Sequence, residues 1–174
     1  MTQGKTPEQT GFMKHTISVL VKHSFNALSR IVGLFSGRGF DIDSISFGQG
    51  QEPGLARITI TTRGDEQIIE QISKQLHKVV DVLKVHDLTY EPFVERELAL
   101  VKVSATKATR SEIMQLVNVF RAKIIDISPE TLTIEVTGSQ DKVDAAVGML
   151  RSFGIIDIAR TGSVALKREF QGET

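Results

Sequence analysis

The chain has 174 residues, of which 40% are hydrophobic, and its 21 lysine and arginine residues are balanced by 21 aspartate and glutamate residues. This length suits one ordinary domain or two small ones, each with a core of its own. Because the net charge is zero, no excess positive field attracts a polyanion, which argues against nucleic acid as a partner.

The two ends of the chain are expected to lie outside the folded part. Residues 1–12 are polar and contain no apolar signal core, so we expect a disordered N-terminal tail. Residues 169–174 are expected to form a second tail. No apolar run reaches the length of a membrane span. We therefore expect a cytoplasmic protein with no membrane partner.

Residues 16–47 predict a strand, a loop, a helix and a second strand. Thr16 to Val21 is a short apolar run rich in β-branched residues. A loop follows, and Asn26 is expected to cap the helix with its side chain. Gly37 and Gly39 are expected to end that helix. The apolar residues of this helix recur at a spacing that places them on one face: Ala27, Leu28, Ile31, Leu34 and Phe35. The second strand is predicted to begin with Phe40, Ile42 and Ile45.

The next segment predicts a third strand, a second helix and a fourth strand. In the third strand, Ala56, Ile58 and Ile60 alternate with residues expected on a solvated face, namely Arg57, Thr59 and Thr61. Two carboxylates, Asp65 and Glu66, stand in the first turn of the helix, where the helix dipole favours them. The fourth strand is predicted at residues 80–85. Residues 15–88 therefore read βαββαβ.

The second half repeats this order after a polar connector that contains Pro92. The expected elements are a strand at 98–103, a helix opened by the capping box 109–112, strands at 123–127 and 132–136, a final helix, and a strand at 155–159. The predicted fold class is therefore α+β, with two ferredoxin-like βαββαβ domains.

Sequence motifs for catalysis or metal binding were not found. The chain has no cysteine, which excludes disulfides and thiolate metal sites, and its histidines are not spaced as a helical metal pair. RNA binding on this architecture would need aromatic residues in the first and third strands, which offer none. An acylphosphatase-like or kinase-like enzyme would need a catalytic arginine, asparagine or histidine site, and the sequence leaves that alternative open.

Five runs in order, NALSRIVGLFSGRGFDIDSI, EQISKQLHKVVDVLKV, VERELALVKV, FRAKIIDIS and IARTGSVAL, resemble the small regulatory subunits of acetolactate synthase. The resemblance implies an ACT domain at residues 13–90 for effector sensing and dimerisation, a linker at 91–95, and an ACT-like domain at 96–168. It also implies a non-catalytic partner of a large subunit, which alone would hold thiamine diphosphate, Mg and FAD. In such a complex this chain forms a homodimer through its ACT domain and carries no cofactor or metal.

The resemblance places a branched-chain amino acid, such as valine, at the loop between the first strand and the first helix, where two copies meet. The implied effector-binding residues are Val21, His23, Ser24, Phe25, Asn26, Ala27, Asp41 and Ile42. The backbone N–H groups of residues 24–27 would hold the ligand carboxylate, and Val21 or Ile42 would face an aliphatic side chain.

Three positions depart from the family pattern, in which the loop carries an asparagine, two further residues and then a glycine. His23 and Asn26 occupy these two positions, and Asp41 replaces a second asparagine. We therefore expect valine to bind weakly or not at all. A free-standing amino-acid sensor that regulates another enzyme is the second interpretation, and an independent enzyme is the third.

Overall fold

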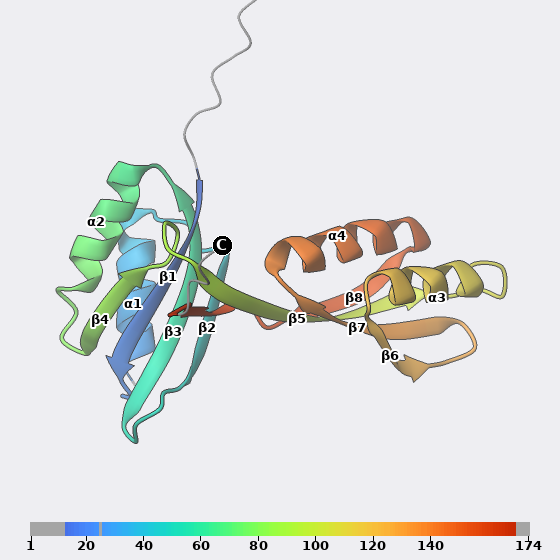
Figure 1. Cartoon of the computed structure of the whole chain (residues 1–174), viewed down its shortest axis with the longest axis horizontal. Helices are drawn as coiled ribbons and strands as arrows, with labels where there is room; N and C mark the ends of the chain where they lie inside the picture. Colours follow the sequence, from blue (N-terminus) through green and yellow to red (C-terminus); the bar gives the residue numbers. More distant parts are fainter. Residues whose placement is uncertain (1–12, 25, 170–174) are drawn as a thin grey trace, which may run out of the picture. The chain divides into compact units, whose positions relative to one another are not determined.

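The computed structural model describes residues 13–24 and 26–169, so the expected tail at 1–12, most of the tail at 169–174, and Phe25 lie outside the described residues. The chain divides into two compact units, Met1–Pro92 and Phe93–Thr174. Each unit has the βαββαβ order (Figure 1). The predicted fold class is therefore confirmed.

The described part of the first unit is an antiparallel sheet with strand order β2-β3-β1-β4. Helices α1 and α2 lie on one face of this sheet (Figure 1). In chain order the elements are β1 (Met13–Lys22), α1 (Ala27–Arg38), β2 (Ser44–Gln49), β3 (Leu55–Gly64), α2 (Glu66–Leu76) and β4 (Val82–Asp87).

The first core forms where alternate residues of the two central strands face the helices. In the β1–β3 register Val19 lies opposite Ile58, and Ile17 lies opposite Ile60. All four side chains are completely buried. Burial of one such side chain contributes about 1.5–3 kcal/mol. The period-two pattern therefore identified the inner face of β3 correctly.

The other face of β3 differs from the prediction, because Thr59 and Thr61 are buried rather than solvated. The strand lies between β1 and β2, so its short side chains are flanked on both sides. The hydroxyl oxygen of Ser44 on β2 lies 2.7 Å from that of Thr61. Arg57, which is longer, remains exposed and donates a hydrogen bond to the Ser18 hydroxyl oxygen at 2.8 Å.

The predicted side-chain cap at Asn26 is wrong. Asn26 precedes α1 with helical backbone angles (φ −95°, ψ −13°), and its side chain makes no capping hydrogen bond. Side-chain capping needs a more extended backbone. Asp65 has one (φ −84°, ψ 174°), and its carboxylate accepts the N–H of Ile68 at 2.8 Å. The C-terminus of α1 agrees with the prediction, because Gly39 has left-handed angles (φ 69°).

Two strand boundaries in the first unit were predicted too early. Phe40 and Ile42 precede β2 rather than belonging to it, and the ring of Phe40 packs edge-on against Phe35 at a centroid distance of 6.0 Å. Val80 lies in the turn before β4. In both places an apolar residue packs from a connector, which a composition pattern cannot distinguish from a strand.

The described part of the second unit has strand order β6-β7-β5-β8, with β9 pairing with β5. In chain order the elements are β5 (Phe93–Ser104), α3 (Arg110–Val119), β6 (Lys123–Ile127), β7 (Thr131–Gly138), α4 (Gln140–Leu150), a 3-10 turn (Arg151–Phe153), β8 (Ile155–Arg160) and β9 (Val164–Lys167). Its core contains Val101, Val103, Ile113, Ile134 and Leu150.

The expected linker at 91–95 is partly strand. Residues 93–96 open β5 and pair with β9, with Phe93 opposite Lys167 and Arg96 opposite Val164. The boundary between the units falls directly before Phe93. Charged side chains and Pro92 give this segment the composition of a connector. Its strand character comes from pairing with β9, which lies about seventy residues further along the chain.

The capping box predicted at Thr109 and Glu112 is also wrong. Thr109 has helical backbone angles, and its hydroxyl accepts the N–H of Thr106 at 3.1 Å instead of capping α3. The start of α3 is held by Arg110, whose guanidinium donates to the carbonyl oxygens of Ser128 (2.7 Å) and Pro129 (2.8 Å). A long-range contact therefore replaces the local cap.

Candidate effector site

The loop between β1 and α1 is a tight turn held by backbone hydrogen bonds. His23 donates its N–H to the Gly54 carbonyl at 2.7 Å, and Ser24 donates to the Lys22 carbonyl at 2.8 Å. The Ala27 N–H reaches the Ser24 carbonyl at 3.3 Å. These contacts fix the direction in which α1 begins, so the positive end of the helix dipole lies at this loop.

This loop has an unsatisfied polar atom and an uncapped helix start. The Ser24 hydroxyl oxygen is buried and has no hydrogen-bond partner among the described residues. No side chain caps α1. Backbone N–H groups of an uncapped first turn retain the capacity to bind an anion. The local geometry therefore suits a carboxylate.

The predicted site residues do not all face this loop. Val21 and Ala27 are completely buried in the core of the first unit. His23 and Asn26 are exposed at the loop, and Ser24 is half-buried. The prediction at Phe25 lies outside the described residues.

Asp41 and Ile42 lie at the other end of α1. The Asp41 carbonyl accepts the Thr62 hydroxyl at 2.5 Å, whereas His23 bonds to Gly54. Position 54 directly precedes β3 and position 62 lies near its end, and strand rise separates them by about 25 Å. One copy of the chain therefore does not bring Asp41 and Ile42 together with His23 and Asn26.

Sequence reasoning missed two exposed apolar side chains of the first unit. Phe47 on the edge strand β2 is 39% exposed, and its ring centroid lies 5.5 Å from that of His23. Val32 on α1 is also 39% exposed. The available signal was the position of Val32 outside the buried stripe of its helix. Phe47 therefore gives the loop an apolar neighbour on the edge strand.

A separate polar cluster lies at the start of α2. His15 is 1% exposed, and its Nδ1 atom lies 3.1 Å from the Thr89 hydroxyl, which in turn donates to Asp87 at 2.5 Å. Partial burial raises the pKa of the neighbouring Tyr90 hydroxyl, and the carboxylates of Glu66 and Asp87 raise it further. The position predicted for the effector is not in this cluster.

In the second unit, the strongest electrostatic feature is the pairing of Arg160 with Glu97. The guanidinium donates to both Glu97 carboxylate oxygens, at 2.7 Å and 2.8 Å, and Asp144 lies 2.8 Å away. The hydrogen bond to Glu97 is the main cause of a raised pKa at Arg160. This cluster joins β5, β8 and α4.

The described residues contain no group of three or more histidine, aspartate or glutamate side chains placed to hold a metal ion. None of the helices within 13–24 and 26–169 combines the length and apolarity needed to cross a membrane.

Both units of the chain match known protein families. Residues 17–84 match the family described as AHAS small subunit-like ACT domain, and residues 96–169 match the family described as small subunit of acetolactate synthase. The "Probable acetolactate synthase small subunit" of Methanothermobacter thermautotrophicus is 51% identical over 155 residues, which cover 88% of this chain and 92% of that protein.

Two further relatives agree with this placement. The acetolactate synthase small subunit of Aquifex aeolicus is 47% identical over 157 residues, covering 90% of this chain and 82% of that protein. The crystal structure of the acetolactate synthase small subunit from Thermotoga maritima is 43% identical and superposes with a TM-score of 0.82, covering 91% of this chain and 99% of that one. The chain belongs to the family of acetolactate synthase small subunits.

Proposed function

We propose that this chain is the regulatory, non-catalytic subunit of acetolactate synthase and serves branched-chain amino-acid biosynthesis. It binds the large catalytic subunit and raises its activity. The observation that carries this proposal is the consecutive match of both units to small-subunit families, over residues 17–84 and 96–169. In this assignment thiamine diphosphate, Mg and FAD belong to the large subunit.

The chain acts as a homodimer joined at the first unit. Strand β2 is an edge of the first sheet, so its outer backbone groups have no neighbouring strand in that sheet. Edge strands of this kind are stabilised by pairing with another copy across a two-fold axis. The exposed side chain of Phe47 lies on this strand and would become buried in the same contact, and we expect the exposed Val32 of α1 to be buried with it.

The dimer also brings the separated effector residues together. In an antiparallel β2–β2 pair, the start of one strand lies beside the end of the other. Phe47 near the end of β2 contacts His23, and Asp41 lies just before the start of β2. Asp41 of one copy therefore approaches His23 and Asn26 of its partner, which produces a site at the interface.

A small amino acid binds at this shared site as the effector. Its carboxylate is held by the uncapped start of α1, and the Asp41 carboxylate of the second copy brings a negative charge close to it, which weakens binding. A ligand held by two copies stabilises the dimer relative to the separate chains. By thermodynamic linkage it also stabilises any state of the complex that requires the dimer. This linkage connects amino-acid concentration to the activity of the large subunit.

Sedimentation of the full chain tests the assembly. Alone, the chain is expected to sediment as a dimer, and with the large subunit it should co-sediment as one complex. The variant Val32→Asp/Phe47→Asp should be monomeric, because each substitution places a charge in the contact. Val119→Asp is the matched control, since Val119 is 75% exposed on α3 of the other unit. A chain that never co-sediments with the large subunit contradicts the proposal and favours a free-standing sensor.

A further inference from the structure

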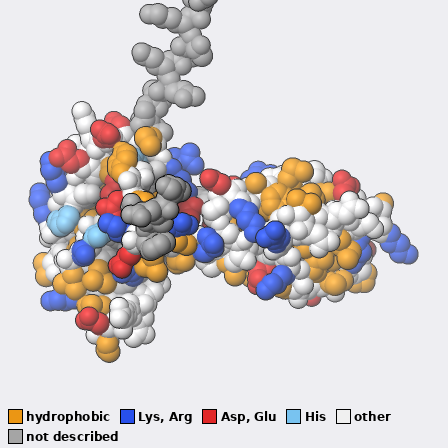
Figure 2. Space-filling view, in the orientation of Figure 1, with side chains coloured by type: hydrophobic (Ala, Val, Ile, Leu, Met, Phe, Trp, Pro, Cys, Tyr) orange, Lys and Arg blue, Asp and Glu red, His pale blue; other side chains and the backbone are white. Residues whose placement is uncertain are grey.

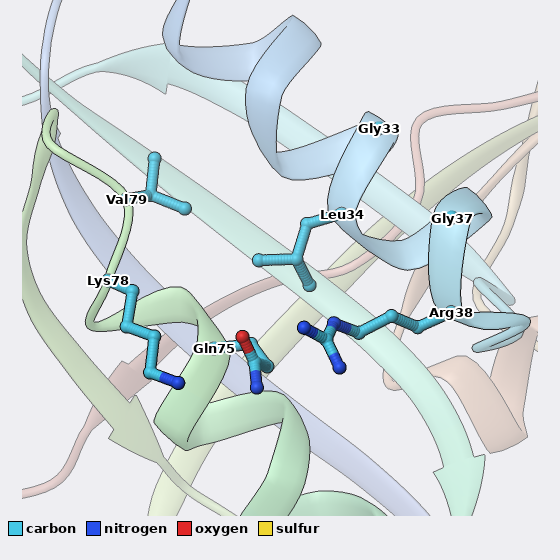
Figure 3. A pocket seen from close by; sticks show the side chains of 7 residues that line it. All are labelled: Gly33, Leu34, Gly37, Arg38, Gln75, Lys78 and Val79. Atoms are coloured by element: carbon cyan, nitrogen blue, oxygen red, sulfur yellow. The ribbon is translucent and has the colours of Figure 1, made fainter.

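A shallow groove runs between α1 and α2 on the helical face of the first unit. Its volume is about 460 Å³, and Gly33, Leu34 and Gly37 of α1 line one side (Figure 3). Gln75 of α2 and the following Lys78 and Val79 line the other. Neither the effector site nor the dimer contact uses this surface.

The glycines of α1 are not explained by packing within the chain. A Cβ atom added at Gly33 or at Gly37 would meet nothing within 4 Å. Glycine inside a helix is unfavourable relative to alanine, so two such positions lower the stability of α1. Their effect is to keep the groove floor low, which lets a second backbone approach the helix closely.

Two basic side chains lie over the same groove. Arg38 and Lys78 extend from opposite sides toward Gln75 (Figure 3). Neither forms an ion pair or hydrogen bond with another described residue. By contrast, Arg30 on the same helix is paired with Asp81 at 2.9 Å. Two unpaired cations directed at one space favour an anionic occupant.

We propose that this groove is the docking surface for an acidic segment of the large catalytic subunit, an inference that rests on the proposed function. The charge pattern selects carboxylates, while Leu34 and Val79 supply an apolar floor. The groove is open along its length, whereas small-molecule sites enclose most of their ligand. A protein segment therefore fits it better than a free small anion.

A second copy of this chain fits the groove less well. Val32 and Gly37 are five residues apart on α1, which places them about 140° apart around the helix. The surface proposed for the dimer therefore lies on a different flank of α1. Both contacts can form at once, so a dimer presents two grooves to large subunits.

The first test is charge reversal. A binding assay with the large subunit immobilised on a surface measures affinity at low and physiological salt. It compares the unmodified dimer with the groove variant Arg38→Glu/Lys78→Glu and the control variant Lys14→Glu/Lys84→Glu. The control makes the same charge change on strands β1 and β4. The groove variant should lose about thirtyfold or more in affinity, while the control stays within about threefold of the unmodified chain.

A second variant separates binding from folding. Gly33→Ala/Gly37→Ala should raise the thermal unfolding temperature of the isolated chain, because the added methyl groups meet open space, yet it should weaken binding of the large subunit. Gly148→Ala is the control, since its Cβ also meets nothing within 4 Å and it lies on α4. A merely structural role of the glycines would not produce opposite changes in stability and affinity.

The outcomes distinguish an error in the docking surface from an error in the proposed function. If the unmodified chain binds and both groove variants bind equally well, the docking surface is wrong and the regulatory function stands. If the unmodified chain does not bind the large subunit at all, both are wrong. If citrate protects the groove arginine from chemical modification while the large subunit does not, the groove is a small-anion site and the proposal is overturned.

Discussion

Removing Arg160 should destabilise the second unit strongly, because Glu97 would remain buried without its partner. Glu97 is 4% exposed and accepts two hydrogen bonds from the guanidinium. Breaking a buried ion pair from one side costs about 3–5 kcal/mol. The Arg160 side chain is itself 32% exposed, so water screens the pair. We therefore expect about 3 kcal/mol for Arg160→Met, at the low end of that range.

The contribution of Asp144 can be separated from this loss. Its side chain is 51% exposed, and exposed ion pairs contribute about 0–1 kcal/mol. Asp144→Asn is therefore the control, with a small effect. The double variant Glu97→Leu/Arg160→Met should recover most of the stability, because it leaves no unpaired charge in the core.

Scanning calorimetry of the full chain measures these effects in the transition of the second unit. For a domain of this size, 3 kcal/mol lowers the unfolding midpoint by about 12–24 °C. The first-unit transition should not move. The reasoning is refuted if Arg160→Met unfolds within about 2 °C of the unmodified chain. It is also refuted if the double variant is as unstable as the single one.

Three further predictions concern the first unit. In urea unfolding, Asn26→Ala should lower the free energy of unfolding by less than about 0.5 kcal/mol and Asp65→Ala by about 1 kcal/mol, because of the two only Asp65 makes a capping bond. Equal losses would contradict the cap geometry. The raised pKa of Tyr90 means that its contribution to stability is complete below about pH 10 and is lost as pH rises through the folded-state pKa. The variant Tyr90→Phe should therefore lose less stability than the unmodified chain as pH rises above that value. An unchanged slope of stability against pH would contradict this. In calorimetry, the triple variant His23→Asn/Asn26→Gly/Asp41→Asn should bind valine about tenfold or more tightly than the unmodified chain, and tight binding by the unmodified chain would show that these departures are neutral.

Strand and helix types were predictable where a segment carries its own periodic pattern and clear end signals. Strand β6 has the predicted bounds Lys123–Ile127, because a turn with Pro129 follows it. Helix α4 begins after Ser139, whose extended backbone lets the side chain accept the Lys142 N–H. In these segments local conformation and tertiary packing favour the same structure.

Predictions failed where a distant contact decides the local structure. Asn26 and Asp65 carry similar capping signals, but only Asp65 has the backbone angles that capping requires, and the sequence does not specify those angles. Strand β9 is four residues long and exists by pairing with the start of β5. No local pattern identifies such a partner.

The sequence predicted which loop carries the candidate site, but not how the site residues are arranged in space. The residues at its centre, His23 and Asn26, are exposed where the resemblance placed them. Alternation along β1 directs Val21 into the core with Val19. Asp41 is distant within one copy, since α1 alone spans about 18 Å between it and the loop. The proposed site needs two copies, so a pattern in one copy cannot specify its geometry.

The rate of acetolactate formation by the large subunit, titrated with this chain, tests the central claim most directly. The full chain alone should form no product. Added to a fixed amount of large subunit, it should raise the rate to a plateau at a fixed ratio of the two chains, and the Val119→Asp control should do the same. A rate that stays constant across the whole titration, under conditions where the two chains co-sediment, would contradict the assignment as an activating subunit.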